Sequence, residues 1–235
     1  MNGFFVIRKC LNKSSIKKIL SEIKLAKNTS KYFDENKLPR RIEKIYNKGI
    51  TLKLVDKIFK KLLKKIFLKN FVIFKDKFNS KPPGGEGFQA HYDGVFKFRN
   101  KSNKFNNGWY KYGNEFVNVL VALDDCHIKN GTIEISKAHE NNFEELYNKT
   151  KKNGTPDLKY QRGLKFIPIP LSSGDVLVFK NTCPHKSKIN NSESHRRTLY
   201  YTYTPSVYGS KYKDYFNDKK ESKNKTSKSL SKKNK

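Results

Sequence analysis

Apolar side chains recur at the spacing of an amphipathic helix in two segments of the N-terminal third of the chain. The first segment places four of them at positions i, i+3, i+4 and i+7: Ile16, Ile19, Leu20 and Ile23. The second segment is longer and has lysines on its opposite face: Val55, Ile58, Phe59, Leu62, Leu63 and Ile66. We therefore expect two helices, the first of them capped by Ser14 or Ser15. The second fits either a helix packed on a sheet or a basic helix lying on a membrane surface.

After Asn70 the pattern changes to short runs rich in β-branched and aromatic residues, separated by Gly, Asn, Pro and Asp. The runs are Phe71–Phe78, Phe116–Leu123, Thr132–Ser136, Phe166–Pro170, Val176–Phe179 and Thr198–Thr204. Helices of useful length are missing between most of these runs, which disfavours a parallel βαβ sheet. The pattern instead predicts a mainly β protein with N-terminal helices, whose core is a double-stranded β-helix of the jelly-roll or cupin-like kind.

The order of these elements predicts one domain over residues 1–218. Its helical N-terminal part is expected over about residues 1–70 and its β core over about residues 71–208. From Lys219 to Lys235 the chain is rich in Lys, Ser and Asn and has no apolar face. Such a segment cannot bury enough apolar surface to order itself, so we expect a disordered basic tail.

The strong positive charge adds an alternative function. The chain carries 51 Lys and Arg against 21 Asp and Glu, a formal net charge of +30. Clustered cations bind phosphates, so a basic nucleic-acid-binding protein is one reading. Lysine and asparagine are, however, frequent in helices, loops and tail alike, which indicates compositional bias. We therefore do not expect nucleic acid as the main partner.

The cysteines and the hydropathy pattern narrow the class of protein further. Cys10, Cys126 and Cys183 are odd in number and lack C-x-x-C spacing, which indicates neither a disulfide framework nor a cysteine zinc site. No segment reaches the roughly 18–20 apolar residues of a membrane-spanning helix. The N-terminal residues also lack the small-residue cleavage site of a signal peptide. We expect a soluble, cytoplasmic protein without a membrane partner; its oligomeric state is not indicated.

A His-x-Asp motif lies in the glycine-rich run Lys81–Gly94. Alternate residues of an extended chain face the same way, so His91 and Asp93 project together and offer an imidazole and a carboxylate to one ion. The motif on its own is common, and a histidine with a purely structural role would explain it as well.

A second motif strengthens the metal hypothesis. The run Ser172–Ser187 contains a Gly-Asp turn, a buried strand and a Pro-His pair at the exit of that strand, and Arg196 follows His185 by eleven residues. Two histidines and one carboxylate on one face of an octahedron leave three positions open, which suits ferrous iron that must bind a co-substrate and O2. An arginine one strand away can bind a carboxylate through two parallel hydrogen bonds.

At these residues the chain resembles the phytanoyl-CoA dioxygenase family of Fe(II)/2-oxoglutarate-dependent oxygenases. The resemblance runs from about Phe71 to Tyr208. It rests on the His-Tyr-Asp run, NVLVALDD, NGTIEISKAH, GDVLVF, the Pro-His pair and the spaced Ser, Asn and Arg that follow. One departure is Lys137–His139, where the family often has Gly-Ser-His, in a turn outside the iron site.

The resemblance implies a site and a reaction. It implies that His91, Asp93 and His185 are the catalytic iron ligands. It also implies that Arg196, assisted by Ser187, binds the distal carboxylate of 2-oxoglutarate. The implied cofactors are Fe(II), 2-oxoglutarate as co-substrate and O2, and the implied outcome is hydroxylation of a substrate with release of succinate and CO2.

A polar row precedes the metal motif. Lys75, Lys77, Asn79 and Lys81 share one face of their strand, while Phe74 and Phe78 are expected on the other. Lys75 and Asn79 are our candidates for binding the inner end of 2-oxoglutarate, and the lysines could equally bind an anionic substrate. A solvated edge face in a lysine-rich protein explains the row just as well.

The substrate is expected to be a small polar molecule, with an anionic head group such as a phosphonate. Within the family, Phe74–Gly94 and Pro184–Ser206 look most similar to the branch that acts on aminoalkylphosphonates. Two other readings keep the metal motif: a zinc-dependent, cupin-like hydrolase or isomerase, which would have no use for Arg196, and a family member that has lost its activity.

Overall fold

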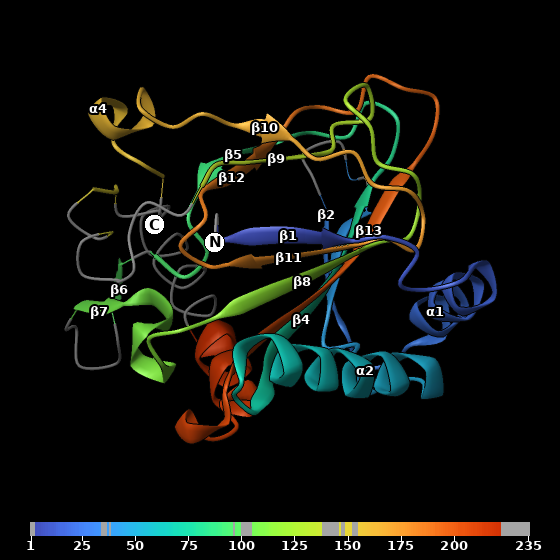
Figure 1. Cartoon of the computed structure of the whole chain (residues 1–235), viewed down its shortest axis with the longest axis horizontal. Helices are drawn as coiled ribbons and strands as arrows, with labels where there is room; N and C mark the ends of the chain where they lie inside the picture. Colours follow the sequence, from blue (N-terminus) through green and yellow to red (C-terminus); the bar gives the residue numbers. More distant parts are fainter. Residues whose placement is uncertain are drawn as a thin grey trace, which may run out of the picture.

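The computed structural model describes residues 3–33, 37, 39–95, 97–99, 105–137, 146, 149–151 and 155–221. Two antiparallel sheets face each other, and two helices cover the outer face of the larger sheet (Figure 1). The larger sheet contains, in spatial order, β1 (Phe4–Ile7), β11 (Val176–Lys180), β8 (Val117–Ala122), β13 (Arg196–Pro205), β4 (Phe71–Lys81), β3 (Pro39–Glu43) and β2 (Ser30–Phe33). The smaller sheet contains β10 (Ile167–Pro168), β9 (Ile133–Ile135), β12 (His185–Ser187) and β5 (Phe88–His91).

The remaining elements are short. Strands β6 (Lys97–Arg99) and β7 (Phe105–Asn107) form a separate hairpin, and η1 (Gly108–Tyr112), α4 (Leu158–Gln161) and η2 (Ser206–Tyr208) are single helical turns. Every strand that the sequence predicts is present with adjusted bounds, which agrees with a double-stranded β-helix. Ala138 and His139, at the end of the NGTIEISKAH motif, lie outside the described residues.

Both predicted helices form, as α1 (Lys13–Leu25) and α2 (Ile50–Phe67). The predicted cap of α1 is wrong, because the side chain of Asn12 caps the helix and accepts a hydrogen bond from the Ser15 amide at 2.8 Å. The Glu22 carboxylate of α1 accepts from the amides of Thr51 and Leu52 at 2.8 and 2.9 Å, and so caps α2. None of the helices in the described part of the chain is long and apolar enough to span a membrane.

The apolar face of α2 packs on the larger sheet. Its buried side chains Leu52, Val55, Phe59 and Leu63 belong to one core cluster with outward-facing residues of β4, β8, β11 and β13. The hydroxyl groups of Tyr201 and Tyr203 on β13 reach the Leu52 carbonyl oxygen and the Asp56 carboxylate of α2, at 3.1 and 3.0 Å. The interpretation of α2 as a helix packed on a sheet is therefore confirmed.

The N-terminal part is mixed rather than helical, since it supplies three strands to the larger sheet. Strand β1 pairs with β11, and β3 pairs with β4. These strands have only four or five residues each, too few to show a period of their own. Their partners lie far along the chain, so tertiary pairing decides their conformation.

A β-bulge in β4 sets which residues face the interior. In the pairing with β13, Thr202 lies opposite Lys75 and Tyr203 lies opposite Ile73, so Phe74 is the extra residue. As predicted, Phe78 faces the helices. The prediction for Phe74 is wrong, because the bulge turns its ring inward to Trp109, whose ring centroid lies 5.1 Å away.

The C-terminal end of the described chain is a helix over residues 212–221. Tyr215 and Phe216 anchor it in the aromatic cluster around Phe74, and Lys219 donates hydrogen bonds to the buried Glu43 carboxylate. The expected start of the tail at Lys219 is therefore too early. Two aromatic side chains just before the lysine-rich run pack on the body of the protein, and the first residues of the run continue the helix. Residues 222–235 lie outside the described residues.

The buried Asp76 carboxylate is expected to contribute strongly to stability. It accepts hydrogen bonds from the amides of Lys44, Ile45 and Tyr46 and from the Tyr212 hydroxyl group, at 2.5 to 3.2 Å. Asp76→Ala should lower the free energy of unfolding by about 3 kcal/mol or more, because several buried donors lose their acceptor. Urea unfolding measures this loss. Asp214→Ala, which removes an exposed carboxylate, is the control and should change stability by less than about 0.5 kcal/mol.

Candidate metal centre and active-site cavity

The smaller sheet brings two histidines and an aspartate together. Strands β5 and β12 pair antiparallel with His91 opposite His185, and Asp93 follows β5 by two residues. One possible ligand atom of each residue lies within 4.8 Å of those of the other two. Among the described residues, this is the one cluster of three such side chains that could hold a metal ion.

Hydrogen bonds orient the two imidazoles. His91 Nδ1 lies 2.8 Å from the Gln89 carbonyl oxygen, and His185 Nδ1 lies 3.2 Å from the Cys183 carbonyl oxygen. A carbonyl oxygen can only accept, so Nδ1 carries the proton and Nε2 keeps its lone pair for a metal. Burial lowers the pKa of His91 and lowers the pKa of His185 to about 3, which keeps both rings neutral.

A polar chain from the larger sheet orients the third ligand. The Asn118 amide donates to Asp93 Oδ2 at 3.0 Å, and the Thr202 hydroxyl group donates to Asn118 Oδ1 at 2.7 Å. Burial alone would raise the pKa of Asp93, but the nearby charges of Lys77 and Lys75 hold it well below its usual range. Asn118 was missed by sequence reasoning, although one asparagine within the apolar run NVLVALDD was a usable signal.

This donor set fits a divalent transition metal. Two neutral imidazoles and one ionised carboxylate supply three ligands and leave coordination positions open, as in non-haem Fe(II) oxygenases. The second ring nitrogen of each histidine and the aspartate are already held by partners, so the ligands are oriented before a metal binds.

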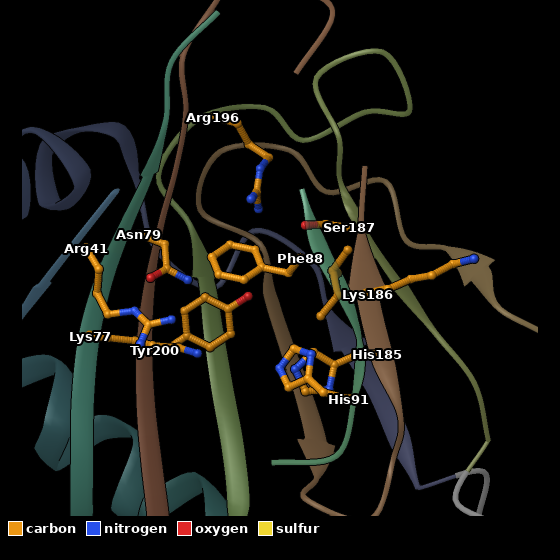
Figure 2. A pocket seen from close by; sticks show the side chains of 11 residues that line it. Arg41, Lys77, Asn79, Phe88, His91, His185, Lys186, Ser187, Arg196 and Tyr200 are labelled. Carbon is orange, nitrogen blue, oxygen red and sulfur yellow. The ribbon is translucent and has the colours of Figure 1, made fainter. Parts of the chain in front are cut away.

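A cavity opens from this cluster between the two sheets (Figure 2). Its wall contains Arg41, Lys77, Asn79, Phe88, His91, Ile133, His185, Lys186, Ser187, Arg196 and Tyr200. Arg196 extends into the cavity at the end away from the two histidines, toward Phe88, and Tyr200 lies between (Figure 2). Arg196 is buried, and within the described part of the chain its Nε atom has no hydrogen-bond partner. A buried guanidinium with free donor capacity is suited to a carboxylate ligand.

Comparison with known families agrees with this geometry. The sequence model of the family described as "Phytanoyl-CoA dioxygenase (PhyH)" matches residues 1–198. The chain belongs to the phytanoyl-CoA dioxygenase family. Family membership agrees with the expected enzyme class, a 2-oxoglutarate-dependent oxygenase that uses Fe(II), 2-oxoglutarate and O2.

Two relatives with sequence similarity to this chain have names that mention phosphonates. The methylphosphonate hydroxylase of Gimesia maris is 31% identical over 152 residues, which are 64% of this chain and 52% of the relative. The 2-aminoethylphosphonate dioxygenase of uncultured bacterium HF130_AEPn_1 is 28% identical over 199 residues, which are 81% of this chain and 70% of the relative. The matched part is thus about half the length of the first relative.

Solved structures confirm the predicted double-stranded β-helix. EctD from S. alaskensis, with 2-oxoglutarate and 5-hydroxyectoine, has a TM-score of 0.66 and 14% identity over 87% of this chain and 73% of its own. The epimerase SnoN, with Fe3+, alpha ketoglutarate and nogalamycin RO, has a TM-score of 0.62 and 12% identity over 87% of this chain and 79% of its own. At these identities the likeness concerns the fold.

The polar row of β4 faces the interior of this family member. Lys75, Lys77, Asn79 and Lys81 are all buried, so the interpretation of the row as a solvated edge is wrong. Lys77 and Asn79 lie in the cavity wall, with Lys77 Nζ 4.4 Å from the centroid of the Tyr200 ring. Lys75 is not brought to the wall, since its Nζ lies 4.4 Å from the centroid of the Trp109 ring.

Ser187 and Lys81 form a contact of their own. Ser187 lies in the cavity wall, where its hydroxyl oxygen accepts a hydrogen bond from Lys81 Nζ at 2.9 Å. The same nitrogen atom donates to the carbonyl oxygens of Lys188 and Gly131, at 2.5 and 3.3 Å. Burial, together with the charges of Arg196 and Arg40, lowers the pKa of Lys81 to about 6. Lys81 therefore ties the end of β4 to two loops.

Sequence reasoning also missed several residues of the wall. Arg41 is one of them. It lies on β3, within a region where a helical part was expected, so nothing in the sequence pattern indicated a place in the cavity for it. Lys186 contributes its stem, while its ammonium points away from the cavity and pairs with Glu134 (Figure 2). Arg197 was expected on the opposite face from Arg196. There it forms a bidentate pair with Asp124, at 2.6 and 2.7 Å.

The metal centre gives a direct test. His185→Ala should abolish high-affinity Fe(II) binding, because two ligands remain. Asn118→Ala should weaken Fe(II) binding about 10- to 100-fold, because Asp93 loses its orienting donor. Anaerobic calorimetry measures both affinities, and the exposed His195→Ala variant is the control. Wild-type affinity in His185→Ala would place the metal elsewhere.

Proposed function

We propose that this protein is an Fe(II)/2-oxoglutarate-dependent oxygenase that hydroxylates a small phosphonate-bearing substrate and releases succinate and CO2. One observation carries the proposal. A cluster suited to iron and a buried arginine lie at the two ends of a single cavity, and Arg41 and Lys77 add positive charge to its wall.

In this proposal the three iron ligands, Arg196 and Asn79 each have a definite task. His91, Asp93 and His185 hold the iron, and Arg196 binds the distal carboxylate of 2-oxoglutarate through its guanidinium. Bound iron and 2-oxoglutarate supply the activation of O2 and the oxidation of a substrate C–H bond. Asn79, with a buried amide oxygen that has no partner among the described residues, accepts a hydrogen bond from a donor group of the substrate between the two ends. The surrounding sheets exclude water from the reacting atoms.

Charge and similarity together favour an organophosphonate. Two of the relatives have names that mention phosphonates, and the cavity wall has more cationic than apolar side chains. A fatty acyl substrate would need an apolar channel, whereas Phe88 and Ile133 are the purely apolar members of this wall. A zinc hydrolase on the same fold would have no use for the buried Arg196.

Arg196 can be tested against its neighbour. Arg196→Lys keeps the charge but loses the planar fork, so the dissociation constant for 2-oxoglutarate should rise about tenfold or more while Fe(II) affinity is retained. Calorimetric titration of 2-oxoglutarate into the metal-loaded protein measures this dissociation constant. Arg197→Lys is a matched control that should leave 2-oxoglutarate binding unchanged. An unaltered affinity in Arg196→Lys would assign the carboxylate to another residue.

The substrate class has its own test. With Fe(II), 2-oxoglutarate and O2, either methylphosphonate or 2-aminoethylphosphonate should raise succinate release well above the rate without substrate. The matching carboxylates, acetate and β-alanine, and an acyl-CoA are the comparisons. Stimulation by an acyl-CoA and by neither phosphonate would refute the phosphonate assignment but keep the oxygenase. No succinate under any condition, with Fe(II) bound, would favour a different metal-dependent reaction.

A further inference from the structure

Three neighbouring strands carry one row of polar side chains across the inner face of the larger sheet. Arg41 of β3 pairs in register with Asn79 of β4, and Asn79 pairs with Thr198 of β13. Each has a buried atom without a hydrogen-bond partner among the described residues: Arg41 Nε, Asn79 Oδ1 and Thr198 Oγ1. Buried polar atoms without partners are rare in folded proteins. Arg41 and Asn79 also lie in the cavity wall, so their end of the row marks a place where a bound molecule completes the hydrogen bonds.

We propose that Arg41 binds the anionic head group of the substrate, and that Lys219 of the C-terminal helix holds Arg41 in position by neutralising Glu43. This inference rests on the proposed function, since it assigns a residue to the head group of the organophosphonate. Arg41 would contact the substrate directly, whereas Lys219 would act through Glu43 and Arg41 as a positioning residue.

Arg41 and Arg196 are separate anion sites in one cavity. Figure 2 shows the Arg41 guanidinium beside Lys77 and Asn79 on one side wall, whereas Arg196 enters from another end. 2-Oxoglutarate has one carboxylate distal to the metal, and Arg196 accounts for it. The second guanidinium, whose Nη1 atom lies 3.6 Å from Glu43 Oε1, is then available for a second anion. Its planar set of donors matches two oxygens of a phosphonate, and Lys77 adds a point charge.

The nearby Glu43 carboxylate competes with a bound anion for the Arg41 guanidinium. Glu43 lies two residues from Arg41 on the same face of β3, its side chain is 1% exposed, and its Oε1 atom is 3.6 Å from Arg41 Nη1. An unopposed buried carboxylate would draw the guanidinium into a bidentate pair. The Arg197–Asp124 pair of the same protein shows that geometry, with contacts of 2.6 and 2.7 Å. Arg41 stops short of it.

Lys219 accounts for the difference. Its Nζ atom lies 2.6 Å from Glu43 Oε1 and 2.5 Å from Oε2, and the Tyr32 hydroxyl group donates to Oε2 at 3.1 Å. Burial alone would raise the pKa of Glu43, but Lys219, Lys75 and Arg41 lower it, so the carboxylate is ionised and already paired. The C-terminal helix thereby leaves the Arg41 guanidinium directed into the cavity.

The head-group contact is tested with Arg41→Ala. The KM for the phosphonate that the wild-type protein turns over should rise about 10- to 100-fold, as expected for a lost charge-assisted hydrogen bond. The KM for 2-oxoglutarate and the affinity for Fe(II) should stay within about twofold of wild type. Calorimetric titration of the same phosphonate into the metal-loaded protein gives an affinity that does not depend on turnover.

The positioning role is tested with Lys219→Met. This change should raise the phosphonate KM about fivefold or more and affect kcat less, because Glu43 then captures Arg41. Lys219→Arg should restore the wild-type KM. In Glu43→Gln/Lys219→Met the competitor is removed together with its partner, so the KM should return toward wild type. Lys220→Met, an exposed neighbour on the same helix, is the matched control.

The outcomes separate the two proposals. Wild-type protein that turns over no phosphonate overturns the proposed substrate and this inference with it. Phosphonate turnover with an unchanged KM in Arg41→Ala overturns the inference alone. If Lys219→Met unfolds the protein, the double variant and Lys219→Arg still decide. A double variant with the KM of folded Arg41→Ala would show that Lys219 does not act through Glu43.

Discussion

The antiparallel pairing of β4 with β13 is the constraint on which the site depends. The bulge at Phe74 shifts the phase of β4 by one residue, so that Lys75, Lys77 and Asn79 lie opposite the inward-facing Thr202, Tyr200 and Thr198. Without that shift, the register that puts Ile73 against the helices would turn the lysines outward as well. The bulge thus allows one strand to bury apolar residues under the helices at one end and polar residues in the cavity at the other.

Burying that many charges requires compensation, and the structure supplies it locally. Lys219 neutralises Glu43, and nearby lysines oppose the charge of Asp93, which also accepts a hydrogen bond from an asparagine. Three backbone amides and a tyrosine donate hydrogen bonds to Asp76. Lys75 and Lys77 lie against aromatic rings. The loss of a partner at any of these places would leave a buried charge without compensation. The C-terminal helix belongs to this network through Lys219, the first residue of the lysine-rich run.

The two sheets divide the work of the cavity. The smaller sheet fixes His91 and His185 through one strand pair and backbone carbonyl oxygens, which gives rigid ligands. The larger sheet carries Arg41, Arg196 and the polar row of β4, so the proposed anion-binding groups stand across from the proposed metal ligands. The two layers are joined at Asp93, because Asn118 and Thr202 of the larger sheet orient this carboxylate. A variant of the larger sheet away from Asn118 and Thr202 can therefore change recognition without removing the metal centre.

The sequence by itself determined the helices α1 and α2, the main strands, the His-x-Asp and Pro-His motifs and Arg196. Each of these has a local signal: a hydrophobic period, a run of β-branched residues or a motif at fixed spacing. Tertiary structure alone decided the strands β1, β2 and β3, the direction of Phe74, and the approach of Arg41, Asn118 and Lys219 to the site. These depend on pairing between segments distant in sequence, where a four-residue strand or a single lysine has no period to read. Long-range hydrogen bonding and charge compensation, rather than local propensity, place them.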